Sequence, residues 1–130
     1  MFRFVQIHYH SEPMRDANTL KNISVEDRLR GAIWGQFVGD AAALGTHWIY
    51  DLAELQQLYP GGLHGFEVPL PGHYHFGKKS GDQTHYGDGA LVLLESLAQE
   101  GRFDIKAFGR RFVEIFQGGA YSGYLDTPRR

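Results

Sequence analysis

The sequence predicts an all-α fold. Four segments carry apolar side chains at the spacing of one helix face, most clearly the row Leu29, Ile33, Phe37, Ala41 and Leu44. Residues that cap helices precede these segments, and glycines follow three of them. The chain shows no convincing strand, because the alternation of apolar and polar residues that begins at Phe2 breaks at Val5.

The first predicted helix begins after Ser24. Asp27 stands three residues further on, which is the spacing of a capping box. Gly31, Gly35 and Gly39 follow at intervals of four and form a face without side chains. Because a glycine inside a helix costs about 1 kcal/mol, we expect this face to admit the backbone of another helix.

The second helix is short and leads into a long connection. Asp51 caps the segment LAELQQLY, and Pro60 with two glycines ends it. Residues 60–87 then form a polar and aromatic connection of a length that is often functional.

The last two helices lie close together in the sequence. The third is predicted from about Asp88 to Gln99 and ends at Gly101, and Asp104 caps a fourth, IKAFGRRFVEIFQ. Residues 1–24 are expected to be a poorly ordered tail, and residues 25–130 the helical domain.

Composition excludes several classes of protein. A net charge of −2 gives no basic surface for nucleic acid or an anionic membrane. The most apolar stretch, residues 31–49, is interrupted by Gln36, Asp40 and His47, which argues against a membrane span. The absence of cysteine, and so of disulfides, is compatible with a reducing compartment, and we expect a cytoplasmic protein.

Residues 80–91, SGDQTHYGDGAL, place many polar groups before an apolar helix. Capping requires only one of them, either Thr84 or Asp88. The additional His85 and Tyr86 favour a functional site at this position.

The histidines of the connection have two interpretations. His73, His75 and His85, with Asp82 and Asp88, offer the nitrogen and oxygen ligands that transition metals take. Their spacing fits no standard zinc pattern, however, which favours a solvated or hydrogen-bonded cluster.

Two features near the end of the first helix also leave alternatives open. Asp40 is either a buried carboxylate that needs a partner or a residue at an exposed helix end. The run THWIYD, residues 46–51, suits stacking on a base or sugar, and equally a core corner with satisfied polar groups.

Two long stretches carry a resemblance to a known family. RLRGAIWGQFVGDAAALGTHWIYD, residues 28–51, and GDQTHYGDGALVLLESLAQEGRFD, residues 81–104, resemble the ADP-ribosylglycohydrolase family, and most of all its J-crystallin branch. The resemblance spans about residues 27–126. It implies an all-α domain that removes ADP-ribose from proteins or small acceptors with a pair of Mg²⁺ ions.

The resemblance also implies a site, from which this sequence departs. The family holds part of its magnesium with a Thr-Asp-Asp run before a helix. Thr84 matches the threonine, but His85 and Tyr86 stand where the aspartates would be. Mg²⁺ prefers oxygen ligands, so the metal motif is degenerate here.

The resemblance implies a cleft that takes an ADP-ribose-like molecule or an ADP-ribosylated substrate. Thr84 is the expected metal ligand, and His85 and Asp88 are the candidate catalytic groups. The residues expected to bind the ligand or cofactor are Asp40, His47, Trp48 and Tyr86.

Three functions remain open at this point. The family continues further, so this chain resembles an N-terminal portion that is expected to be inactive alone and to expose apolar faces. A complete protein would hydrolyse ADP-ribosyl glycosidic bonds. The alternatives are a non-enzymatic binding or structural module on the same fold, or a different hydrolase with His85 as general base.

Overall fold

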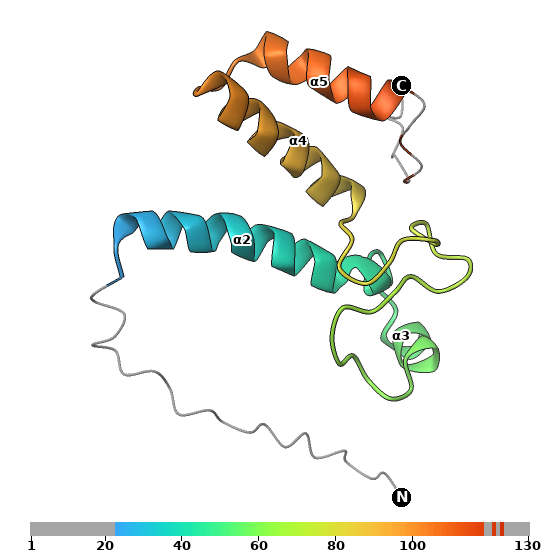
Figure 1. Ribbon diagram of the computed structural model, residues 1–130. Coiled ribbons are helices and arrows are strands. Elements are labelled where there is room, and N and C mark those ends of the chain that lie inside the picture. Colours follow the sequence, from blue (N-terminus) through green and yellow to red (C-terminus); the bar gives the residue numbers. More distant parts are fainter. Residues whose placement is uncertain (1–22, 119–120, 122, 124–130) are drawn as a thin grey trace, which may run out of the picture. The chain divides into compact units, whose positions relative to one another are not determined.

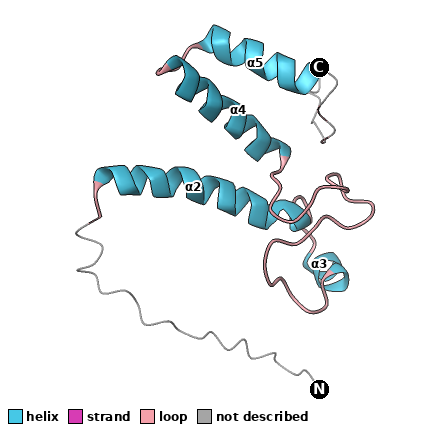
Figure 2. Cartoon of the chain, viewed as in Figure 1, coloured by secondary structure: helices cyan, strands magenta, loops and turns pink. Residues whose placement is uncertain are grey.

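The computed structural model describes residues 23–118, 121 and 123, and these residues form helices and loops without a strand. The prediction of an all-α fold is therefore confirmed (Figures 1 and 2). The elements are α2 (Val25–Ala43), the short 3₁₀ helix η1 (Leu44–Thr46), α3 (Leu52–Leu58), α4 (His85–Glu100) and α5 (Ile105–Gln117).

The chain divides into two compact units, residues 1–32 and residues 33–130. All but the last two residues of the expected tail, 1–24, lie outside the described residues. Along the described helices, none is long and apolar enough to cross a membrane.

Three predicted helix caps are confirmed. The Ser24 hydroxyl accepts a hydrogen bond from the backbone N–H of Asp27 and donates one to its carboxylate. One carboxylate oxygen of Asp51 accepts hydrogen bonds from two amides in the first turn of α3. Asp104 caps α5 in the same way. These side chains satisfy backbone donors that a helix start would otherwise leave without partners.

Helix α4 begins three residues earlier than predicted. Its N-cap is Thr84, whose hydroxyl oxygen accepts a hydrogen bond from the Tyr86 N–H. The helix starts here because Thr84 is extended and its side chain satisfies this amide, so Asp88 lies inside the first turn instead of before it. Gly101 ends the helix in the left-handed conformation, as predicted.

Helices α4 and α5 form a hairpin (Figure 1). Arg111 of α5 reaches across it and forms a two-pronged ion pair with the carboxylate of Glu95. A row of rings on α5, Phe108, Phe112 and Phe116, packs in succession with centroids 4.5–5.7 Å apart. The ion pair and the close packing of the two helices hold α4 against α5, and the N-terminus of α4 carries several of the predicted site residues.

The glycine face of α2 differs from its prediction. An added Cβ at Gly35 or Gly39 would meet no atom within 4 Å, so within the described part of the second unit no helix approaches this face. Two apolar side chains on the same stretch of α2 are solvent-exposed, Trp34 at 70% and Val38 at 52%. The expectation of close helix packing there is wrong for the described residues.

The connection after α3 packs on η1. The Tyr59 hydroxyl donates a hydrogen bond to the carbonyl oxygen of Gly45 at 2.8 Å. A Cβ at Gly45 would lie 2.5 Å from the carbonyl oxygen of Glu67, so only glycine allows this approach. The contact holds the loop against the segment that carries His47.

Candidate metal centre

Asp40 and Thr84 join the end of α2 to the start of α4. Thr84 is fully buried, and its backbone N–H and its hydroxyl donate hydrogen bonds to the two oxygens of the Asp40 carboxylate, each at 2.7 Å. Of the two interpretations of Asp40, the paired carboxylate is the observed one. Hydrogen bonds to a charged acceptor are roughly twice as strong as neutral ones, so this link orients the N-terminus of α4.

Gly87 makes that link possible. An added Cβ at this position would collide with the Asp40 carboxylate and with the amide oxygen of Gln83. Gly87 is buried in the first turn of α4. Its lack of a side chain therefore leaves the space that the Asp40 carboxylate occupies.

His47 and Trp48 follow η1 directly. The backbone N–H of His47 bonds to the Leu44 carbonyl and ends the 3₁₀ turn. Trp48 has φ of +66°, and it is the one non-glycine residue with a positive φ in the described segments. A bulky residue in this region is strained, and such strain often accompanies functional sites. The turn directs both side chains toward the same cluster of rings.

His73 connects two parts of the site through both of its ring nitrogens. The His75 N–H donates to Nδ1 of His73 at 3.0 Å, which makes Nδ1 an acceptor. Nε2 therefore carries the proton and donates to the carbonyl oxygen of His47 at 2.8 Å. His73 thus holds the backbone of His75 beside that of His47, although 28 residues separate the two.

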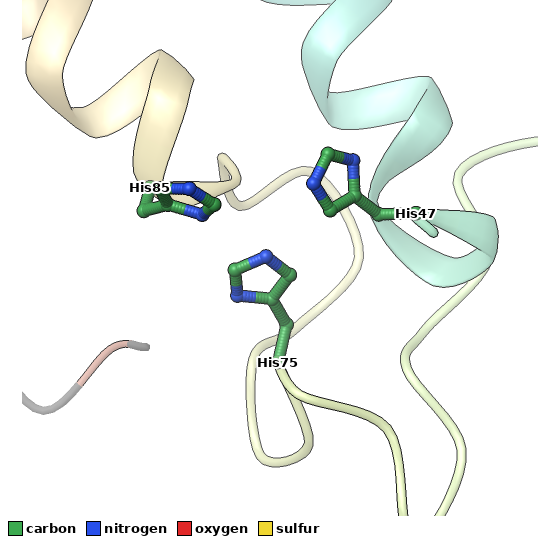
Figure 3. Close-up of side chains that lie close together, drawn as sticks. All are labelled: His47, His75 and His85. Atoms are coloured by element: carbon green, nitrogen blue, oxygen red, sulfur yellow. The ribbon is translucent and has the colours of Figure 1, made fainter. Parts of the chain in front are cut away.

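Three histidines converge at this point (Figure 3). His47 comes from the segment after η1, His75 from the connection, and His85 from the first position of α4. One ring nitrogen from each lies within 4.8 Å of those of the other two. Figure 3 shows the three rings directed toward a common space.

Burial lowers the pKa of two histidines of this cluster. Only 2% of His75 is exposed, and burial, followed by repulsion from His47 and His85, lowers the pKa of His75 to about 4. Burial also lowers the pKa of His47, with His85 adding to the effect and Asp40 opposing it. His75 is therefore neutral at physiological pH, which is the state in which imidazole binds metals.

Aromatic rings surround the three histidines. The ring of Trp48 lies 4.7 Å from His47 and 5.4 Å from His85, and that of Tyr86 lies 4.0 Å from His85. Tyr74 packs edge-on against Trp48 at 5.1 Å. In this setting both ring nitrogens of His75 and of His85 are buried.

A cavity of about 690 Å³ adjoins the cluster at His75. Asp88 lies in its wall and accepts hydrogen bonds from Lys78 Nζ at 2.7 Å and the Tyr121 hydroxyl at 2.6 Å. Burial and the bond to Asp88 raise the pKa of Tyr121 above its ordinary value. The side chains around the cavity include Tyr74, His75, Phe76, Lys78, Lys79, Gln83, Asp88 and Tyr121.

The structure brings most of the predicted site residues together. Thr84 contacts Asp40, and the rings of His47, Trp48, His85 and Tyr86 form one cluster. Asp88 is bound to Lys78 and Tyr121 instead.

The metal grouping considered from the sequence is rearranged. His75 and His85 do converge, but their third partner is His47, since both ring nitrogens of His73 are engaged elsewhere. Asp82 is not part of the three-histidine group, and its carboxylate accepts from the Lys79 N–H in an exposed turn. In the sequence, His73 and His75 both count as candidate ligands. The structure places only His75 in the three-histidine group.

Comparison with known proteins agrees with this architecture. The family model for ADP-ribosylglycohydrolase matches residues 21–129. No curated protein and no solved structure matches the chain. Because the match covers most of the 130 residues, the chain belongs to the ADP-ribosylglycohydrolase family.

Proposed function

We propose that this chain binds an ADP-ribosyl group in the cavity beside α4 and takes part in hydrolysis of the glycosidic bond of that group. The cavity carries the proposal. Its volume of about 690 Å³ falls within the range of small-molecule sites. Family membership supplies the substrate class, since the family is defined by hydrolysis of ADP-ribosyl bonds.

The chemistry of the cavity wall suits such a ligand. Tyr74 and Phe76 offer aromatic surface for a base or a ribose ring. Lys78 is paired with Asp88, so the more exposed Lys79 is the cation we expect to meet the diphosphate. A tenfold change in affinity on loss of this contact would correspond to about 1.4 kcal/mol.

The residues present do not fit a magnesium pair at the position that the resemblance implies. The Thr84 hydroxyl already donates to Asp40 and accepts from Tyr86. The next two side chains are an imidazole and a phenol, and Mg²⁺ prefers hard oxygen ligands with several waters. This misfit favours a second candidate function, a non-enzymatic binding module of the J-crystallin kind.

Calorimetric titration of the full chain with ADP-ribose tests the binding. We expect saturable binding to one site, weakened about tenfold in Lys79→Met. The matched control is Lys106→Met, because this exposed lysine of α5 does not line the cavity. Absence of saturable binding to the folded wild-type chain would refute the proposal.

Release of ADP-ribose separates the two candidate functions. The substrate is an ADP-ribosylated peptide, and chromatography measures the free product. Turnover by the wild-type chain supports hydrolysis. Binding without turnover shows that this chain by itself acts as a binding module.

A further inference from the structure

His47, His75 and His85 meet in three dimensions although they are far apart in the sequence. Each belongs to a different segment, and one ring nitrogen of each lies within 4.8 Å of those of the other two (Figure 3). Convergence from three segments is not a by-product of helix periodicity or of a local sequence repeat.

The ring nitrogens of this cluster are largely withdrawn from solvent. Both ring nitrogens of His75 and of His85 are buried, as is Nε2 of His47. Within the described part of the chain, Nε2 of His47 has no hydrogen-bond partner. A buried polar atom without a partner destabilises the folded state, and coordination of a metal would remove that cost.

We propose that His47, His75 and His85 form a binding site for a single divalent transition-metal ion of the zinc class. Imidazole nitrogen is a preferred ligand of Zn²⁺ and of its neighbours in the first transition row. A tetrahedral zinc with bonds of about 2.0–2.1 Å requires its nitrogens roughly 3.3 Å apart. Rotation of the side chains that moves each ring nitrogen by about an ångström therefore brings the nitrogens to coordination distance. The fold does not need to change.

The contacts around the cluster prepare it for this ion. His73 holds the backbones of His47 and His75 side by side. The link between Asp40 and Thr84 fixes the start of α4, and with it His85. The backbone at each of the three ligands is thus held in place by hydrogen bonds, as a metal site of defined geometry requires.

Three protein ligands leave a fourth position open. In zinc proteins, this arrangement is typical of catalytic sites, whereas structural sites use four protein ligands. His75 lines the cavity of about 690 Å³, so a water molecule or an oxygen of a ligand in that cavity can complete the coordination. The metal site does not depend on the proposed function, because its three ligands lie on this chain whatever occupies the cavity.

Titration of the chelator-treated full chain with Zn²⁺, and separately with Co²⁺, tests this inference. We expect one bound ion per chain, and for Co²⁺ the intense visible absorption of a tetrahedral site. His75→Gln and His85→Gln should each lower the zinc affinity by about 100-fold, since even loss of a supporting contact lowers it ~10–100-fold. His64→Gln is the matched control, because His64 is exposed and outside the cluster.

The outcomes are distinct even if one variant fails to fold. Circular dichroism in the presence of chelator shows whether each variant retains the wild-type helix content, and only variants that do are compared. The inference is overturned if the wild-type chain does not bind one Zn²⁺ per chain. Wild-type affinity in the two cluster variants, or loss of affinity in His64→Gln, also overturns it, since either result places the ion on surface histidines. Zinc binding without ADP-ribose binding would support the metal site and refute the proposed function.

Discussion

Replacing Thr84 by Val tests the contact on which the site geometry depends. Val keeps the shape of the fully buried side chain and the backbone hydrogen bond to Asp40, but it removes the hydroxyl. A hydrogen bond to a charged group contributes about 1.5–3 kcal/mol, and the lower value applies because Asp40 is half-buried. Loss of the N-cap adds about 1 kcal/mol. We therefore expect the free energy of unfolding to fall by about 2–3 kcal/mol.

Thr84→Ser is the control for this change. It retains the hydroxyl and loses one methyl group, which costs about 1 kcal/mol. Urea unfolding followed by tryptophan fluorescence measures both variants, since Trp48 lies next to the cluster. The expected loss corresponds to a fall in melting temperature of about 10–20 °C for a unit of this size. If Thr84→Val unfolds at the same urea concentration as Thr84→Ser, the hydroxyl does not hold α4 to α2.

The remaining predictions concern single residues of the same unit. Gly87→Ala should lower the melting temperature, because the new methyl group displaces the Asp40 carboxylate. The control Gly89→Ala should be neutral or stabilising, because the nearest atom would lie 3.9 Å from the new Cβ. Hydrogen bonds from backbone amides hold the pKa of Asp104 below its ordinary value of 3.8. The cap therefore stabilises the fold fully above pH 3.8, and this stabilisation is lost as the pH falls through the lower pKa of the folded state. The stability of wild type relative to Asp104→Asn, which caps without titrating, should therefore decrease when melts are repeated from about pH 6 to about pH 3. If the three histidines bind zinc, His73→Phe should weaken that binding about 10–100-fold in the same titration that tests the ligands, and unchanged affinity would show that His73 does not position them.

The sequence predicts the helices because their signals are local. Asp51 and Asp104 lie immediately before the amides that they cap, and Gly101 supplies the left-handed residue that ends α4. The start of α4 is misplaced by three residues because two capping side chains, Thr84 and Asp88, stand within one turn of each other. Local sequence does not show which of them satisfies the first amides.

The site is only partly predictable, since its parts meet through tertiary structure. The residues expected at the cleft, such as His47, Trp48 and His85, do come together. The third histidine of the group is His47 and not His73 because of the way the connection folds back onto η1. The spacing of residues in the sequence does not predict this folding. The glycines of α2 show the reverse case. Their regular spacing predicts a packed helix face, but no described residue of the second unit packs on it.

One experiment tests the central claim, that a three-histidine metal centre lies beside a cavity proposed to bind ADP-ribose. It is a thermal melt of the full, chelator-treated chain, followed by tryptophan fluorescence, with Zn²⁺ or Mg²⁺ and with or without ADP-ribose. A ligand that binds only the folded state at 100 times its Kd stabilises it by about 2.7 kcal/mol. We expect Zn²⁺ and ADP-ribose each to raise the melting temperature, and Mg²⁺ to have no effect. A rise with Mg²⁺ and none with Zn²⁺ would contradict the account, because it would show that the chain retains the oxygen-ligand site of its family.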